Sequence, residues 1–162
     1  MKFERVSFEQ YMNDCIAMGR GAVTGEEMRR EWEAIKLPTR ATSGSAGYDF
    51  FMPYETAVSC EPVCIPTGIR CQIDEGYVLM CCPKSGLGCK YHMALENTVG
   101  IIDADYYDSD NEGHIMAKFR TDHPLTLKEG QKFVQGIFLP FGITDDDYAE
   151  GLRNGGFGST GF

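Results

Sequence analysis

The sequence contains no run of 18 apolar residues, and its first residues, 1–5, carry no apolar signal-peptide core. We therefore expect no membrane-spanning helix and a cytoplasmic protein. Basic residues are scarce, since 15 Lys and Arg stand against 24 Asp and Glu, for a net charge of −9. Because nucleic-acid binding needs a basic face, neither DNA nor RNA is an expected partner.

The sequence also lacks the cysteine spacing of metal and redox sites and the glycine-rich motif of P-loop proteins. The seven cysteines contain no Cys-x-x-Cys pair, which is the spacing of zinc and redox sites, and their odd number argues against a complete disulfide framework. We expect reduced thiols that fill space, with adjacent Cys81 and Cys82 on opposite faces of a strand. Gly-x-x-x-x-Gly-Lys-[Ser/Thr] is absent and no long helix follows a strand, so a P-loop or Rossmann fold is excluded.

The first 36 residues favour two short helices. Ser7-x-x-Gln10 and Thr24-x-x-Glu27 are capping boxes, and an apolar stripe of helical spacing follows each. The stripes comprise Phe8, Tyr11, Met12, Cys15 and Ile16 in the first helix and Met28, Trp32 and Ile35 in the second. Because such stripes are typical of packing surfaces, we expect residues 1–36 to form a helical extension with a structural role rather than a ligand-binding one.

From Leu37 onward, short strands alternate with turn residues. The expected strands cover residues 63–73, 77–82, 97–107, 114–119 and 132–139, with a polar loop between the third and the fourth. This spacing predicts an all-β domain over residues 37–150, folded as a distorted jelly roll or β-barrel.

The last residues, 151–162, form a glycine-rich tail that also carries an arginine, two hydroxyls and a phenylalanine. Glycines let backbone N–H groups approach an oxyanion, and the hydroxyls and the guanidinium add donors. We expect a flexible lid that closes over an anion. A flexible tail without a ligand is the alternative.

Five segments, taken in order, resemble the motif set of the homotrimeric dUTPases (deoxyuridine 5′-triphosphate nucleotidohydrolases). They are Ala46–Asp49, Pro83–Leu87, Asn97–Tyr106, Glu129–Gln135 and the tail. The resemblance spans residues 36–162. It implies dUTP as substrate, Mg²⁺ as cofactor, hydrolysis to dUMP and pyrophosphate, and a homotrimer whose chains share the active sites.

The third segment carries most of the implied chemistry, on what we expect to be one arm of a β-hairpin. Asp103 matches the general base, which holds and deprotonates the water that attacks the α-phosphorus. Asn97 matches the amide that pairs with uracil, and Tyr106 matches the ring that packs on deoxyribose and leaves no space for a 2′-hydroxyl. Contacts to the base are implied for the backbone around Ile101, Ile102 and Met116. Without the other segments, Asp103 and Asp105 would indicate a turn or a solvated strand edge.

The second segment implies contacts with the α- and β-phosphates through Lys84, Ser85 and Gly86. Lys84 stands where relatives commonly carry arginine, so the charge is kept and bidentate contact is lost. Gln135 matches the glutamine of the fourth segment, a neutral phosphate or interface contact. Asp49 matches the carboxylate of the first, which supports the metal–water network or a subunit contact; a strand-end salt bridge is the alternative.

In the tail, the resemblance implies a ring over uracil and contacts with the outer phosphates. The matching residues are Arg153, Phe157, Gly158, Ser159 and Thr160. Arg153 stands one residue closer to Phe157 than is common. Mg²⁺ is held mostly by phosphate oxygens and waters in such proteins, so we expect no direct protein ligand.

Residues 107–112 lengthen the turn after Tyr106 compared with many relatives. Asp108-x-Asp110-x-Glu112-Gly113 also imitates the start of an EF-hand loop, but Phe119 stands at position twelve and no flanking helices are expected, so we do not expect a calcium site.

Two other functions stay open. The dCTP deaminases share the expected fold, but they do not combine the 97–106 arrangement with a complete Gly-Gly-Phe-Gly-Ser-Thr-Gly tail, and ammonia release from dCTP would identify one. A regulatory or partner-binding protein on the same scaffold would use the N-terminal helices or the lengthened turn. Loss of Asp103 or Tyr106 would favour that second alternative, and both residues are present.

Overall fold

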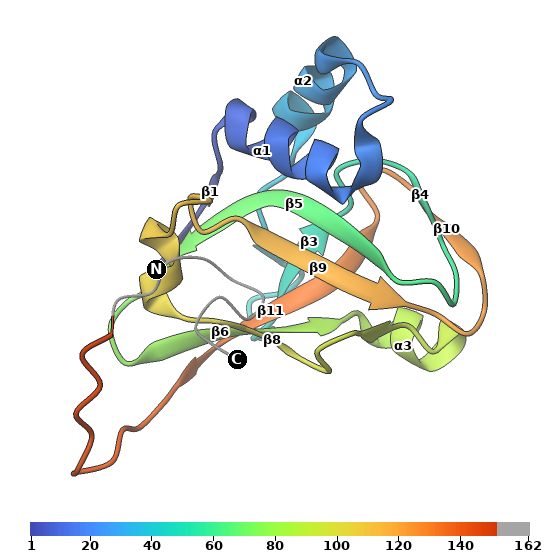
Figure 1. Cartoon of the computed structure of the whole chain (residues 1–162). Helices are drawn as coiled ribbons and strands as arrows, with labels where there is room; N and C mark the ends of the chain where they lie inside the picture. Colours follow the sequence, from blue (N-terminus) through green and yellow to red (C-terminus); the bar gives the residue numbers. More distant parts are fainter. Residues whose placement is uncertain (152–162) are drawn as a thin grey trace.

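Two antiparallel sheets facing each other make up most of the molecule, as Figure 1 shows for the computed structural model, which describes residues 1–151. One sheet has the strand order β2-β3-β11-β6-β8 and the other β1-β5-β9-β7, and a two-stranded ribbon, β10-β4, lies beside them. The expected distorted jelly roll is confirmed, and the described strands do not close into a barrel.

The elements follow one another along the chain with these bounds. The strands are β1 (Lys2–Arg5), β2 (Thr39–Arg40), β3 (Tyr48–Phe51), β4 (Thr56–Val58), β5 (Val63–Gln72), β6 (Tyr77–Pro83), β7 (Ala94–Leu95), β8 (Gly100–Ile102), β9 (Ile115–Arg120), β10 (Leu125–Leu127) and β11 (Lys132–Pro140). The helices are α1 (Phe8–Cys15), a π-helical turn (Ile16–Arg20), α2 (Gly25–Ala34), α3 (Ser85–Tyr91) and a 3₁₀ helix (Ala104–Asp108). None of the helices within residues 1–151 is long and apolar enough to cross a membrane.

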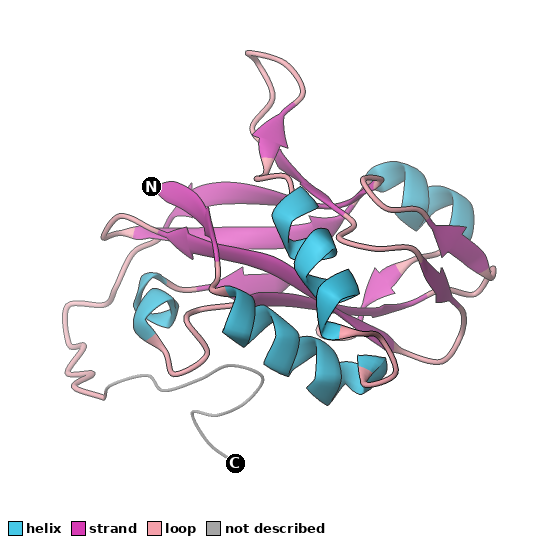
Figure 2. Ribbon diagram, turned by 90° about the horizontal axis from the view of Figure 1, so that it is seen from above, coloured by secondary structure: helices cyan, strands magenta, loops and turns pink. Residues whose placement is uncertain are grey.

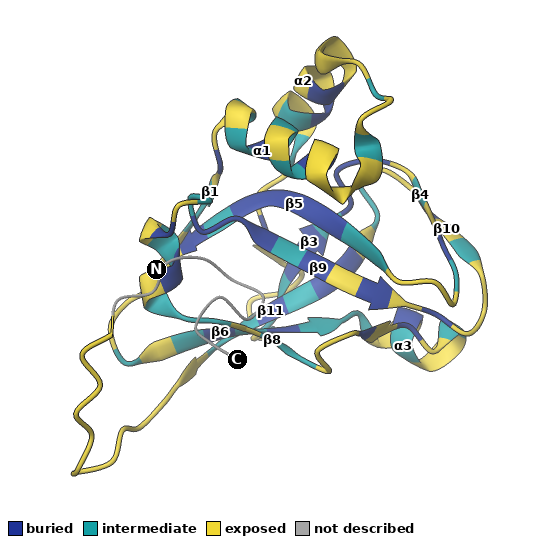
Figure 3. Ribbon diagram, viewed as in Figure 1, coloured by how far each residue is buried: buried dark blue, intermediate teal, exposed yellow. Residues whose placement is uncertain are grey.

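Aromatic side chains fill the space between the sheets. Phe119 of β9 and Phe133 of β11, one from each sheet, are fully buried with their ring centroids 5.8 Å apart. Phe3 of β1 likewise reaches Phe50 of β3, at 5.6 Å. Figure 3 shows the buried residues concentrated along β5 and β9, and exposed residues on the outer helices. Apolar burial between two sheets is thus the main source of stability.

Both predicted helix starts are confirmed. The Ser7 hydroxyl accepts a hydrogen bond from the Gln10 N–H, and the Thr24 hydroxyl accepts one from the Glu27 N–H. The expected stripe is right for buried Tyr11 and Cys15 but wrong for Ile16, which is exposed because the chain passes into the π-helical turn there.

Helices α1 and α2 lie over the outer side of β5 (Figures 1 and 2). They approach it closely at Gly68, where a Cβ atom would lie 2.2 Å from Cδ1 of Ile35 and where φ is +72°. Glycine is therefore required at this bulge in β5 both by space and by conformation. The extension also contains β1, which pairs with β5 and was not predicted from the sequence.

One predicted feature is wrong. The segment from Asn97 to Tyr107 was expected to be a single strand of a hairpin with 114–119. Instead β8 covers only Gly100–Ile102 and pairs with β6, whereas β9 pairs with β5 and β7. The chain between them turns through the 3₁₀ helix and crosses from one sheet to the other, because Asp103 and the polar residues after it favour turns over a continuing strand.

All seven cysteines lie within the described residues, and each is a free thiol. Cys81 is buried and Cys82 half-buried on the two faces of β6, as expected. Burial raises the pKa of the Cys81 thiol to about 12, so this cysteine stays protonated and unreactive.

Candidate active site

A cluster of charged side chains joins the first, second and fourth motifs. Asp49 of β3 is buried, and its two carboxylate oxygens lie 2.6 Å from Nζ of Lys84 and 2.7 Å from Nζ of Lys132. Strand pairing brings these residues together, since β11 lies between β3 and β6 in the sheet. The salt bridge left open by the sequence is therefore observed, and a role for Asp49 in a metal–water network stays a prediction.

The Asp49 carboxylate is ionised despite its burial. Burial alone would raise its pKa, but hydrogen bonds from Lys132 and Lys84 outweigh that effect and lower the pKa below the usual value. One carboxylate thus holds two ammonium groups side by side. Such a pair of cations at a strand end is suited to a phosphate ligand, with Asp49 fixing where they stand.

The phosphate motif itself is accessible. After β6 ends at Pro83, the Lys84 N–H donates to the Phe133 carbonyl at 2.9 Å, which ties the motif to β11. Ser85 and Gly86 then begin α3 and are exposed. A Cβ atom on Gly86 would meet nothing within 4 Å, so the backbone here is open to a ligand.

Gln135 lies in the same region. It stands opposite Asp49 in the β3–β11 pair and opposite Cys82 in the β6–β11 pair. An added Cβ on Gly47 would lie 3.0 Å from Oε1 of Gln135, so the first motif needs its glycine to let this side chain pass.

The third motif spreads along β8 and beyond it. Asn97 is exposed in the turn before β8, and Ile101 is half exposed, at 50%. Asp103 is half-buried where β8 ends, and its carbonyl accepts the Tyr106 N–H at 3.2 Å. The Tyr106 hydroxyl donates to the carbonyl of His114, two residues before half-buried Met116 of β9. The end of β8, the 3₁₀ helix and β9 therefore place three of the expected substrate-contacting residues in one part of the molecule: Asp103, Tyr106 and Met116. Ile102, the last residue of β8, immediately precedes Asp103.

Within one chain, Asp103 lies apart from the charged cluster of Asp49, Lys84 and Lys132. Ile102 pairs with Leu79, so Asp103 lies beyond the Leu79 side of β6, whereas Lys84 follows the opposite end. The five residue steps from Leu79 to Lys84 correspond to about 16 Å of extended chain. A single chain consequently holds the expected base and the expected phosphate-binding residues at opposite ends of one strand.

Sequence reasoning missed two residues of this site. Lys132, like Lys84, forms an ion pair with Asp49. Its position in the fourth motif, three residues before Gln135, was the sequence feature that could have identified it. His114 is fully buried and accepts a hydrogen bond at Nε2 from the Gly68 N–H at 2.8 Å. No pattern in the sequence indicated that contact. The five tail residues Arg153, Phe157, Gly158, Ser159 and Thr160 lie outside the described part of the chain.

The double-sheet fold defines the class of protein as a jelly roll, and its ordered motifs resemble those of nucleotide hydrolases. More particularly, the dUTPase family model matches residues 33–162, and the chain belongs to that family. Deoxyuridine 5′-triphosphate nucleotidohydrolase from Lactococcus lactis subsp. lactis is 40% identical over 139 residues, which cover 78% of this chain and 89% of the relative.

Solved structures agree with this assignment. The crystal structure of dUTPase from Streptococcus mutans is similar over 90% of this chain and 99% of its own, with a TM-score of 0.65 and 32% identity. A mutant of the dUTPase from phage phi11 of S. aureus, in which a structural Mg(II) ion is coordinated, has a TM-score of 0.60 at 21% identity. That match covers 72% of this chain and 91% of the phage protein, and it supports the fold alone.

Proposed function

We propose that the chain hydrolyses dUTP to dUMP and pyrophosphate. The family match over residues 33–162, which includes all five motifs, carries this proposal, and the curated relatives are named for the same reaction. The test is pyrophosphate release from dUTP, UTP, dTTP and dCTP in the presence of Mg²⁺. Release from dUTP alone is expected, and release of ammonia from dCTP would instead indicate a deaminase.

In the proposed mechanism, Asp103 accepts a proton from a water molecule as the water oxygen attacks the α-phosphorus. The bond from that phosphorus to the bridging oxygen breaks, and pyrophosphate leaves with the electron pair. Lys84, Ser85 and Gly86 bind the α- and β-phosphates, and Gln135 adds a neutral contact. The two ammonium groups held by Asp49 stabilise the charge that develops on the leaving group.

Selection of the base rests on hydrogen bonds and space. Asn97 pairs with the edge of uracil, and the backbone around Ile101, Ile102 and Met116 closes on the ring. A wrong base would leave buried polar groups without partners, at a cost of roughly 1–3 kcal/mol each. The methyl group of thymine is excluded by space.

Mg²⁺ fits this site as an ion held by the substrate. Residues 1–151 contain no group of three or more His, Cys, Asp or Glu side chains placed to hold a metal. We expect phosphate oxygens and waters to coordinate the ion. When bound, Mg²⁺ offsets the charge of the triphosphate. Asp49 supports its water network only indirectly, because both carboxylate oxygens accept from lysines.

We expect a homotrimer with shared sites, in the cytoplasm. The separation of Asp103 from Lys84 along β6 supports sharing, because a neighbouring chain can bring its phosphate motif to Asp103 when one chain cannot. Light scattering should give the mass of three 18.1 kDa chains, about 54 kDa. A monomer with full activity would contradict the shared site.

Sugar selection is expected to depend on Tyr106. Tyr106→Ala should raise kcat/KM for UTP relative to dUTP by about tenfold or more, because it opens the space that a 2′-hydroxyl needs. The ratio of the two rates is the measurement, since it does not change with the fraction of folded enzyme. Tyr148→Ala, which removes a ring that is 87% exposed, is the control and should leave the ratio unchanged. An unchanged ratio in Tyr106→Ala would place sugar selection elsewhere.

A further inference from the structure

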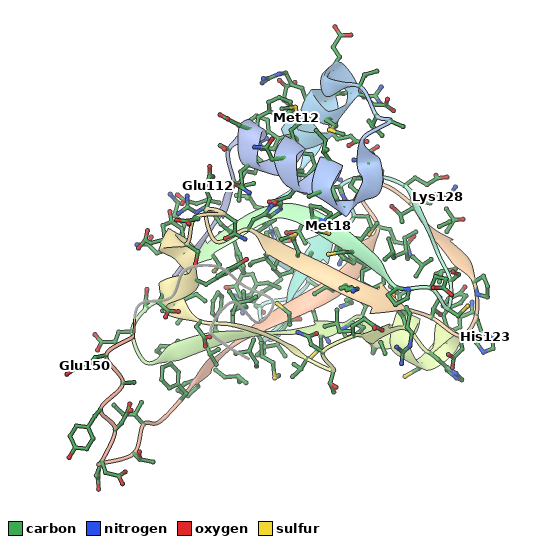
Figure 4. All side chains as sticks on the ribbon, in the orientation of Figure 1. Met12, Met18, Glu112, His123, Lys128 and Glu150 are labelled. Carbon is green, nitrogen blue, oxygen red and sulfur yellow. The ribbon has the colours of Figure 1, made fainter. Side chains whose placement is uncertain are left out.

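The N-terminal extension contacts the segment that carries Tyr106 at three points. The Tyr107 hydroxyl donates to the Glu4 carboxylate at 2.5 Å. The N–H and hydroxyl of Ser7 donate to the Glu112 carboxylate at 2.7 and 2.6 Å, and Figure 4 shows Glu112 beside the start of α1. The third contact joins Asp14 to His114 at 2.5 Å. We call Glu4, Ser7 and Asp14 the N-terminal clamp.

The third contact is buried and has a fixed hydrogen-bond direction. His114 is fully buried, and its Nε2 lies 2.8 Å from the Gly68 backbone nitrogen. Because that N–H can only donate, Nε2 must accept and the ring proton must reside on Nδ1. Nδ1 therefore donates to Oδ2 of Asp14, which also accepts from the Gln10 side chain at 2.8 Å.

Asp14 is well suited to hold this ring as a charged acceptor. Burial alone would raise its pKa, but the hydrogen bonds from His114 and Gln10 outweigh burial and lower it. The carboxylate therefore remains ionised at neutral pH. A charged acceptor strengthens the bond to Nδ1–H and opposes rotation of the ring.

His114 in turn holds Tyr106. The Tyr106 hydroxyl donates to the His114 carbonyl at 2.8 Å and accepts from Nδ2 of Asn111 at 2.7 Å. Gly113 brings the two backbones together, since its φ is +65° and an added Cβ would lie 2.7 Å from the Tyr106 carbonyl oxygen. A shift of the His114 backbone would therefore move the phenol ring with it.

We propose that Asp14 and His114 are positioning residues for sugar selection, which act by fixing the place of the Tyr106 ring. The inference rests on the proposed function, in which that ring excludes a 2′-hydroxyl. The clamp lies in residues 1–32, which precede the region that the family model matches. This extension thus contributes to substrate selection without touching the substrate.

Three variants test the proposal, each compared with wild type in kcat/KM for dUTP and for UTP. Asp14→Ala removes the acceptor and should lower the dUTP-to-UTP ratio about tenfold, because small displacements of a positioned group have effects of this order or larger. Asp14→Asn keeps one oxygen, which can accept from both His114 and Gln10, and should restore the ratio to within about twofold. Asn13→Ala changes an exposed neighbour on α1 and should leave the ratio at the wild-type value.

A purely structural role for Asp14 would lower both rates by the same factor and leave the ratio unchanged, which would overturn the proposal. If Asp14→Ala is insoluble, Gln10→Ala removes the second hydrogen bond that fixes the Asp14 carboxylate and should lower the ratio about twofold to threefold; an unchanged ratio there overturns the proposal too. Wild type that is active and selective, with unaltered selection in these variants, refutes only the positioning role. Wild type without dUTP hydrolysis refutes both this role and the proposed function.

Discussion

Replacing Asp103 by asparagine is expected to lower the turnover of dUTP by about 10²- to 10⁴-fold, which is the usual effect of losing a positioned general base. The amide keeps the shape of the carboxylate but cannot accept a proton from water. Nucleotide affinity should stay within a few-fold of wild type, because Asp103 is assigned to the water rather than to the phosphates. Turnover is measured by pyrophosphate release, and affinity by calorimetric titration with a non-hydrolysable dUTP analogue.

Asp105→Asn is the matched control, since it makes the same change two residues away at an exposed position in the 3₁₀ helix. Its turnover should remain close to wild type. Near wild-type hydrolysis by Asp103→Asn would show that another group accepts the proton. A large loss in both variants would point to the fold of the segment rather than to one carboxylate.

The sequence predicted the elements that local chemistry determines. Ser7 and Thr24 begin helices because their side chains accept backbone N–H groups three residues later, and this depends on nearby residues alone. The long apolar strands β5, β6 and β11 were also predicted, because their residue pattern is likewise local to each segment. Pairing between distant strands is not local, which is why β1 was missed. Its four residues become a strand only because β5 offers an edge to pair with.

The site was predicted in its parts but not in its arrangement. Motif positions follow from residue types, so Asp49, Lys84 and Gln135 were named, and the sheet brings them together. The ion pair between Asp49 and Lys132 could not be predicted without knowing the strand order. The separation of Asp103 from Lys84 could not be predicted either, because it depends on the β6–β8 register and no residue pattern specifies that register. The burial of His114 against the N-terminal helix likewise depends on packing between segments about 100 residues apart.

Deleting residues 152–162 is expected to lower dUTP turnover by about 10²-fold or more and to leave the rest of the protein folded. The sequence of this segment offers donors for the outer phosphates and a ring for uracil, and closure would exclude bulk water from the site while the attacking water stays bound at Asp103. Misplacing a bound substrate typically costs on the order of 10²-fold in rate. Within residues 1–151 the last strand, β11, ends at Pro140, so the deletion removes none of the described strands.

The turnover of the truncated chain distinguishes a lid from a simple tail, once that chain is shown to be folded. Circular dichroism and light scattering should show that the truncated chain keeps the fold and the assembly of the full-length chain, because the core residues and strands of the described part of the chain all lie within residues 1–140. Leu152→Ala is the control, since no contact with substrate is assigned to Leu152, and it should keep its turnover. Phe157→Ala should lose a large part of the turnover if the ring covers the base. A truncated protein that keeps its rate would instead mean that Asp103, Lys84 and their neighbours suffice for catalysis, and that the glycines and hydroxyls of the tail have no part in it.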